Sequence, residues 1–507
     1  MKRITVIILL LSLSLVSVAQ KKSVKKVPEP ISVIPADTRV FEGMRKHQTE
    51  PGMENREIDG YRGLWYTVLQ RESDYGDKYS GGLATYTAKH RPMAIYSKEA
   101  DKTFFVYGGT PRKGEKYLLC MVGCYDHKTG MLRKPVVAID KGCNKVIDCH
   151  DNPVISIDKD GYIWVFAAGR GNTRPGIRVR SSKPYDISHF DYVNEGTMAY
   201  PQVYYNKDRG FFLFCTRYDG VRRSFFQTSP DGIEWSDYMP VASIVEPGET
   251  RSGHYQITAY DGKDKLVSTF NRHIDGACDT RTNIYYIQST DWGKTWTAAD
   301  GKTVIDLPVE REQGPALIRD YRSEGRNCYI KDVNFDSKGN PIIYFVTSDN
   351  YKCGPEGGIR RHGIAHWTGK KWFFNEEFTT SNHNYDTGSI WVEGKDWYII
   401  TTSGTGPQPW GTGGEVQKFK TSNGGRSFRL VANLTEKSPR NHAYVRRPLY
   451  NSDDFYAFWA DGDPNGVLET SYLYFCNKAG EVFRMPYDMD ELWMKPEKLD
   501  DIPYRNR

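Results

Sequence analysis

The feature that most constrains the fold is a hairpin pattern that recurs along the chain. Each copy contains a short strand, a polar turn of Asp, Asn, Lys and Gly, and a second strand rich in aromatic and β-branched residues. A single hairpin cannot bury both of its faces, whereas four-stranded blades packed around an axis can. Seven copies follow one another at a mean spacing of about 59 residues, near the period of the larger propeller repeats; they begin at Tyr96, Ser156, Tyr204, Ala259, Phe335, Trp391 and Leu449. We therefore expect an all-β protein, a seven-bladed β-propeller that fills residues 55–490.

A second pattern supports the same class of fold. Ser289–Trp296 matches the Asp-box pattern S-x-D-x-G-x-T-W, Thr421–Phe428 matches it with Asn in place of Asp, and Ser229–Trp235 is a shorter relative. In such a turn the Asp side chain caps backbone N–H groups and Gly takes a positive φ. The aromatic residue then packs between neighbouring strands, so we expect these segments to be structural.

The two ends of the chain differ from the repeat region. Lys2 and Arg3 precede an apolar stretch and a small-x-small cleavage site, so residues 1–19 are predicted to be a secretory signal peptide. Residues 20–54 then form a linker and N-terminal extension, and residues 491–507 a C-terminal tail. We expect a periplasmic or secreted monomer with no membrane span. Nine cysteines spread over 507 residues do not indicate a disulfide scaffold, although Cys120 with Cys124, or Cys143 with Cys149, are candidate pairs.

Charge excludes one class of partner. The formal net charge of +6 comes wholly from six cations among the first 26 positions, so the repeat region is close to neutral. Nucleic-acid-binding proteins carry a basic face or stripe on the folded body, and nucleic acid is therefore not an expected partner.

The predicted blades bring polar residues to one mouth of the propeller. There each inner strand begins and the loop after the second strand returns, so functional residues are expected at those two places. Residues before inner strands are His90, His150, Tyr200, His254 and Tyr255; residues after second strands are Arg170, Arg174, Arg217, Tyr218, Arg222, Arg272, His273 and Arg361. Arg offers a planar fork to carboxylate or sulfate, which predicts an acidic polysaccharide or oligosaccharide as partner.

No cofactor and no metal are expected at this mouth. A single His at a strand start is more often structural than catalytic, but several at matching positions favour function. Cys278, Cys328 and Cys353 with His273 and His362 are an alternative as zinc ligands, although their spacing fits no tight ligand motif.

Several segments resemble a known family of propellers. They are YRGLWY (61–66), KYSGGLATY (78–86), KHRPMAIY (89–96), KTFFVYGG (102–109), DHKTG (126–130), HDNPVISID (150–158) and KPYDI (183–187). These look like the BNR-type seven-bladed propellers that degrade uronic-acid glycans, a group containing ulvan and rhamnosyl-glucuronate lyases and the family 145 exo-α-L-rhamnosidases. The resemblance is dense over residues 61–235 and continues as a repeat pattern to about 480.

The resemblance implies two sets of roles. In the lyases, the motif at His150 carries a catalytic or substrate-orienting His, an Arg such as Arg217 or Arg222 would neutralise the uronate, and Tyr200 or Tyr218 would transfer protons. Where the lyases usually have a second His, this chain has Arg170. In the rhamnosidases, the segment at His90 resembles the region of the single catalytic His.

The sequence has no obvious pair of carboxylates such as ordinary glycosidases use. The retained His90 and the altered Arg170 favour an exo-acting α-L-rhamnosidase that releases rhamnose linked to glucuronic acid in plant or algal glycans. One alternative is a polysaccharide lyase that cleaves rhamnosyl-glucuronate (ulvan-type) linkages by β-elimination. The other is a glycan-binding propeller without catalytic activity.

Overall fold

A computed structural model describes residues 52–67, 75, 79–83, 89–170, 174–218, 222–466 and 469–501. The predicted signal peptide and the predicted linker up to residue 51 lie outside the described residues. Among the described residues, no helix has the length and hydrophobicity that a membrane crossing requires.

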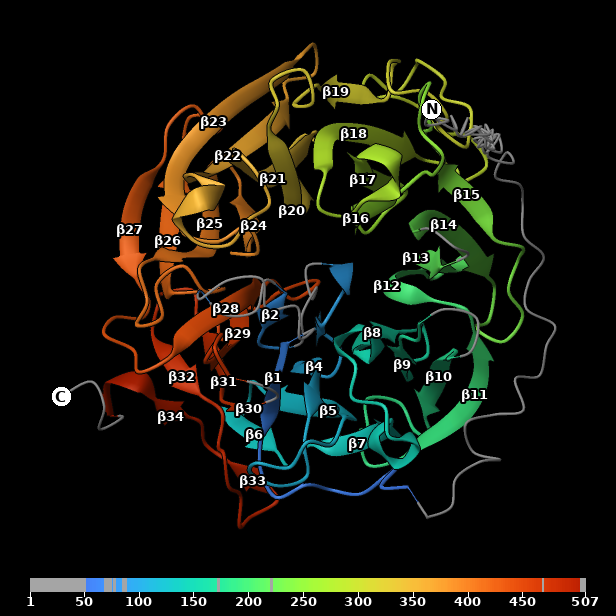
Figure 1. Ribbon diagram of the computed structural model, residues 1–507. Helices are drawn as coiled ribbons and strands as arrows, with labels where there is room; N and C mark the ends of the chain where they lie inside the picture. The colour runs from blue at the N-terminus through green and yellow to red at the C-terminus, as the bar shows by residue number, and fades with distance from the viewer. Residues whose placement is uncertain are drawn as a thin grey trace, which may run out of the picture.

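The described strands form antiparallel sheets arranged around a central axis (Figure 1). The all-β propeller architecture predicted from the repeat is thereby confirmed. Five sheets contain four consecutive strands each: β8 (Pro153–Ile157), β9 (Ile163–Ala167), β10 (Gly176–Ser181) and β11 (Phe190–Gly196); β12 (Ala199–Asn206), β13 (Gly210–Tyr218), β14 (Arg222–Ser229) and β15 (Met239–Ala242); β16 (His254–Tyr260), β17 (Leu266–His273), β18 (Arg281–Ser289) and β19 (Leu317–Arg319); β20 (Asn327–Phe335), β21 (Pro341–Ser348), β22 (Arg360–Trp367) and β23 (Trp372–Ser381); β24 (Gly388–Glu393), β25 (Asp396–Gly404), β26 (Glu415–Thr421) and β27 (Arg429–Asn433).

The remaining two sheets contain the ends of the described chain. A five-stranded sheet contains β28 (Asn441–Arg446), β29 (Ala457–Gly462), β31 (Leu473–Cys476), β32 (Val482–Arg484) and β34 (Glu497–Lys498). A nine-stranded sheet contains β1 (Gly63–Thr67), β2 (Ser80–Gly81), β3 (Ala94–Ser97), β4 (Lys102–Gly109), β5 (Leu119–Asp126), β6 (Met131–Arg133), β7 (Val136–Asp140), β30 (Glu469–Ser471) and β33 (Trp493–Met494). Short 3-10 turns occur at Gly142–Asn144, Cys149–Asp151, Ile274–Gly276, Pro355–Gly357 and Leu499–Asp501.

The nine-stranded sheet departs from the seven equal repeats predicted. The other six sheets each form one blade, whereas this sheet combines the first hairpin unit with strands from both ends of the described chain. β30 pairs with β1 and β33 pairs with β6, so the N-terminal and C-terminal segments are held together by backbone hydrogen bonds. β33 and β34 also lie beyond residue 490, the end of the predicted propeller region.

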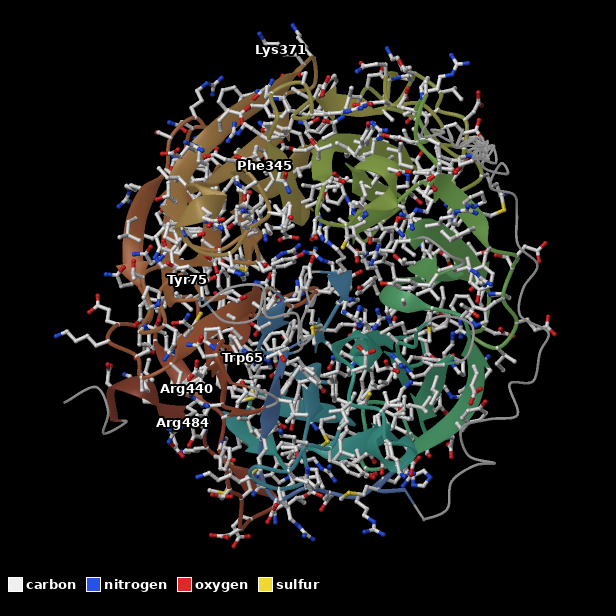
Figure 2. The ribbon with its side chains drawn as sticks, viewed as in Figure 1. Trp65, Tyr75, Phe345, Lys371, Arg440 and Arg484 are labelled. Carbon is white, nitrogen blue, oxygen red and sulfur yellow. The ribbon has the colours of Figure 1, made fainter. Side chains whose placement is uncertain are left out.

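Blade strands are apolar on both faces because each blade is covered by two neighbours. β13 shows this arrangement, since adjacent residues point to opposite faces of a strand. Phe211 contacts Trp164 of the preceding blade, with ring centroids 5.0 Å apart, and Phe212 contacts Trp292 of the following blade at 5.4 Å. Full burial of each such ring stabilises the fold by about 1.5–3 kcal/mol. Figure 2 shows that apolar side chains lie within the blades and charged ones at the rim: Phe345 lies inside a blade, and Lys371 projects from the outer rim.

The Asp box at Ser289–Trp296 is the turn device that the sequence predicts. Asp291 accepts hydrogen bonds from the backbone N–H and the hydroxyl of Thr295, at 2.9 and 2.7 Å. Gly293 has a φ of 86°, and Trp296 packs against Phe226 of the preceding blade. The predicted bond between Cys120 and Cys124 is absent, because both side chains are buried free thiols.

Candidate functional site

A group of tyrosines surrounds the propeller axis where the inner strands begin. Its members are Tyr200 on β12, Tyr255 on β16, Tyr329 on β20, Tyr385 before β24 and Tyr444 on β28, which belong with Tyr66 and Tyr79 to one packed cluster. Tyr200 has a φ of 49° and Tyr444 a φ of 61°. Positive φ is costly for a bulky residue and is concentrated at functional sites. The mouth predicted from the repeats is therefore lined by aromatic side chains.

His150 is held at this mouth by Asp148. One carboxylate oxygen of Asp148 accepts from the backbone N–H of His150 at 2.9 Å and lies 2.5 Å from its Nδ1. Burial acts to raise the pKa of Asp148, but the hydrogen bond and charge of His150 and the charge of Arg174 outweigh it and hold this pKa well below its usual range. An ionised carboxylate can only accept, so Nδ1 carries a proton. The lone pair of a neutral His150 is consequently on Nε2.

Two of the predicted arginines, Arg170 and Arg174, pair with carboxylates beside His150. Arg174 lies 2.6 Å from Asp148 and 2.7 Å from Asp151, and Arg170 lies 3.3 Å from Asp148. Lys141 pairs with Asp151 at 3.0 Å, and both of these side chains are fully buried. Arg170, 43% exposed, is the most accessible member of the group. It thus joins the His150 site through Asp148.

Tyr218 connects His150 with the tyrosines at the axis. Its hydroxyl donates to that of Tyr200 at 3.0 Å, and its ring centroid lies 6.4 Å from that of His150. The ring of Tyr200 lies 5.4 Å from that of His150. Tyr218 is partly exposed, whereas His150 and Tyr200 are buried. Burial, with repulsion from Tyr255, raises the pKa of Tyr218 well above its usual value, so its phenol is protonated at neutral pH.

Arg222 and Arg170 approach the ring of Tyr218. Each guanidinium carbon lies 5.8 Å from the centroid of that ring, within the range of a cation–π contact. Among the described residues no carboxylate pairs with Arg222. Arg217 instead stacks on Tyr238 at 4.0 Å and is buried, so it is directed away from Tyr218.

Four other predicted residues have neighbours that restrict their roles. Arg272 is fully buried between Glu249 and Glu312. His254 accepts from the N–H of Ile244 and contacts the carbonyl of Asn271, which makes it a structural His. The other two predicted residues also have close neighbours: Arg361 lies beside Asp349 and Glu377, and His273 packs against Tyr255 with centroids 4.7 Å apart.

His90, predicted as a catalytic residue, has no exposed surface. Its Nε2 donates to the backbone carbonyl of His150 at 3.2 Å, and its ring lies 5.6 Å from that of Tyr200. His90 therefore stabilises the backbone of the segment that contains His150.

Sequence reasoning missed several cations around the tyrosines. Arg281 lies 4.7 Å from the ring of Tyr255, 4.8 Å from that of Tyr329 and 5.5 Å from that of Tyr385. Lys89 lies over Tyr255 at 4.7 Å, and burial, with the charge of Arg281, lowers its pKa well below the usual value. Tyr329 was detectable because it occupies the strand-start position of Tyr200 and Tyr255. The cations follow no repeated position.

A zinc site of the predicted alternative kind is not formed. Across the described residues, no three or more His, Cys, Asp or Glu side chains gather as metal ligands. Cys353 contacts His383, with Sγ and Nε2 3.7 Å apart, and His362 hydrogen bonds with Tyr344 and Ser381.

The fold and the site define a β-propeller with an Arg, His and Tyr mouth. Residues 85–377 match the model of the BNR repeat-containing family, which covers more than half of the chain. The chain belongs to that family.

Two curated relatives of the chain are named as ulvan lyases. The chain is 24% identical over 404 residues to an ulvan lyase from Nonlabens ulvanivorans, covering 71% of this chain and 79% of the relative. It is also 24% identical to "Ulvan Lyase-PL25" from Pseudoalteromonas sp. (strain PLSV), covering 54% and 62%.

A solved structure shares the fold. It is a PL25 ulvan lyase bound to -[GlcA(1-4)Rha3S]-, with a TM-score of 0.66 and 16% identity, covering 83% of this chain and 96% of that one. The expected exo-α-L-rhamnosidase is wrong, because the curated relatives are named as ulvan lyases. Sequence reasoning gave too much weight to His90 and to the replacement at Arg170.

Proposed function

We propose that this protein is a polysaccharide lyase that cleaves a glucuronate–rhamnose linkage of an ulvan-type polysaccharide by β-elimination. The observation that carries the proposal is the position of Tyr218, whose hydroxyl lies at hydrogen-bond distance from Tyr200 between His150 and two arginines. The similarity to proteins named as ulvan lyases supports the same reaction and substrate class.

The first requirement of elimination is neutralisation of the uronate carboxylate, which makes the C5 proton acidic enough to remove. Arg222 is assigned this task because it lies beside Tyr218 and no described carboxylate competes for it. Arg170 is the second candidate for this task, although it already forms an ion pair with Asp148. Arg272 is excluded by its two buried glutamate partners.

The second requirement is a base and an acid. His150 is the proposed base, because Asp148 fixes its proton on Nδ1 and leaves the lone pair on Nε2. His150 removes the C5 proton, the C5 electron pair forms the C4=C5 double bond, and the C4–O4 bond breaks. Tyr218 is the proposed acid that protonates the departing O4, because its phenol remains protonated. Tyr200 is a positioning residue that accepts the Tyr218 hydrogen bond.

The remaining predictions fit this assignment. An extracellular location suits an enzyme that acts on a large polysaccharide, and the N-terminal sequence favours export. A monomeric state stays a prediction.

The nine-stranded sheet is proposed to serve as a seventh blade. Its strands β3, β4, β5 and β7 pair in sequence order, as strands do in the regular blades. β3 also forms a bridge with Leu449, next to β28, and Pro92 accepts from Ile155 on β8. Removing residues 491–507 deletes β33 and β34 and should lower Tm; an unchanged Tm would oppose the idea that the chain ends close the ring.

The experiment that tests the reaction is digestion of ulvan in water labelled with heavy oxygen, followed by mass spectrometry. Elimination gives products with a C4=C5 double bond and no labelled oxygen at the broken C4–O4 bond, because water does not enter the reaction. Products that gain the mass of one water and contain no C4=C5 double bond would show hydrolysis and overturn the proposal. Intact ulvan after prolonged incubation with folded protein would support the glycan-binding alternative.

A further inference from the structure

A cavity lies on the propeller axis beyond the tyrosines. Its volume is about 60 Å³, and inner strands of several blades contribute its walls. Tyr204, Asp332 and Arg446 lie two to four residues further along their strands than Tyr200, Tyr329 and Tyr444, respectively. At about 3.3 Å per residue, the cavity is displaced along the axis from the proposed catalytic tyrosines.

The cavity carries an excess of positive charge. Arg91, Arg446 and Arg447 line it, and Asp332 is the one acidic residue among its lining side chains. Asp332 is already engaged: its Oδ1 accepts from Arg91 at 2.5 Å and from the N–H of Val333 at 2.8 Å, and its Oδ2 accepts from the N–H of Ile390 at 2.7 Å. Arg446 and Arg447 therefore form no ion pair among the described residues, and the charge of Asp332 reaches them only at longer range.

Arg446 and Arg447 also have unsatisfied donors. Arg446 is 4% exposed, and its Nε and Nη2 make no hydrogen bond within the described part of the chain; the same holds for Nε of Arg447. Burial, with repulsion from Arg91, lowers the pKa of Arg446 well below its usual value. A buried donor that lacks an acceptor destabilises the folded protein, and the effect is larger when the donor is charged. An anion in the cavity would satisfy both the donors and the charge.

A route connects the cavity with solvent. A second, larger hollow of about 460 Å³ lies next to it, and the two share Tyr260, Asn334, Arg447 and Leu449. Arg447 therefore stands at the junction, while Arg446 lies deeper inside. A small ligand can enter from this side without crossing the tyrosines.

We propose that the axial cavity is a binding site for a small tetrahedral oxyanion, sulfate or phosphate, held by Arg446 and Arg447. Planar guanidinium groups match the oxygens of such anions, and two of them with free donors can bind one anion from two directions. The site is independent of the proposed lyase reaction, since none of the residues assigned to elimination contacts the anion.

The test is calorimetric titration of the full chain with sodium sulfate and with sodium phosphate, at ionic strength held constant with sodium chloride. We expect saturable binding of one anion per chain. Arg447→Gln, at the opening, should weaken binding about tenfold, and Arg446→Met should weaken it at least as much. Arg429→Gln, on the exposed strand β27, removes the same charge elsewhere and should bind as the wild type does.

Selenate locates the anion directly by its anomalous scattering in a crystal. Selenium density between Arg446 and Arg447 would support the proposal, and an empty cavity at saturating selenate would overturn it. Equal sulfate affinity in the wild type and in Arg447→Gln would overturn it as well, even if Arg446→Met does not fold. Preference for phosphate or for sulfate in the two titrations identifies which oxyanion the site selects.

Discussion

The hydroxyl of Tyr218 donates a hydrogen bond to the hydroxyl of Tyr200 across 3.0 Å, from the end of β13 to the start of β12. This contact joins a partly exposed phenol to a buried one, directly beside His150. A proton donor that is accessible to substrate and supported from behind is what protonation of a departing sugar oxygen requires.

Tyr218→Phe should therefore remove the acid and keep the ring. We expect kcat on ulvan to fall about 100-fold or more, with little change in Tm. Tyr286→Phe is the control, because it removes the hydroxyl of another tyrosine, one that is fully buried and bonds to Gln288. Activity of Tyr218→Phe equal to that of the control would remove Tyr218 from the mechanism.

Arg222 should act through the uronate carboxylate. Arg222→Gln keeps a hydrogen-bond donor but loses the charge, so we expect kcat/KM to fall by about tenfold or more. Arg223→Gln removes the same charge from the next residue, whose side chain points to the other face of β14. Steady-state kinetics of both variants on ulvan would separate a specific role from a general loss of positive charge, and equal effects would contradict the assignment.

Asp148 should matter because it fixes the tautomer of His150. Asp148→Asn removes the charged acceptor at Nδ1, and we expect a loss of activity of about 100-fold or more. Asp160→Asn, on an exposed turn, serves as a control. Activity of Asp148→Asn equal to that of the control would show that Asp148 only pairs with Arg174.

The buried histidines predict how stability depends on pH. Burial lowers the pKa of His254 to about 4 and that of His442 to about 3. In each ring one nitrogen accepts from an N–H donor, of Ile244 or of Trp459, and this arrangement requires the neutral form. The unfolded chain binds these protons near its ordinary pKa of about 6.5, so stability is present above that pH and is lost as pH falls toward 4.

The expected cost is on the order of 2 kcal/mol per histidine at about pH 4.5. Urea unfolding at a series of pH values checks this, with His254→Gln as the comparison. The variant should be less stable at neutral pH and should lose less stability on acidification. Parallel pH profiles of the two proteins would contradict the account.

Arg272 should contribute to stability and not to activity, because its guanidinium is buried between two glutamates. Glu312→Ala leaves a buried guanidinium with one partner in place of two, and we expect a loss of about 3–5 kcal/mol of unfolding free energy. Urea denaturation measures it. A change below about 1 kcal/mol would show that Glu312 does not stabilise the buried charge.

The sequence predicts much of this arrangement because blade geometry converts a linear repeat into a ring. Tyr200 and Tyr218 were identifiable from their positions before and after predicted strands, and His150 from its motif. The same positions also predicted Arg272 and His254 as site residues. Their partners, Glu249, Glu312 and the backbone of Asn271, come from loops and strand packing that no repeat specifies.

Lys89 and Arg281 escaped prediction for a related reason. Their importance comes from the aromatic rings of three blades that surround them, and this depends on packing across the axis. The repeat pattern also could not predict how many blades are regular, because β30 and β33 return from the C-terminal region to join the first sheet.

The most direct measurement is one reaction of purified protein with a glucuronate–rhamnose oligosaccharide from ulvan, followed by ultraviolet absorbance and by assay of free rhamnose. Elimination creates an unsaturated uronate, so we expect absorbance to rise with no release of free rhamnose, and to stay flat with Tyr218→Phe. Free rhamnose without a rise in absorbance would contradict the account.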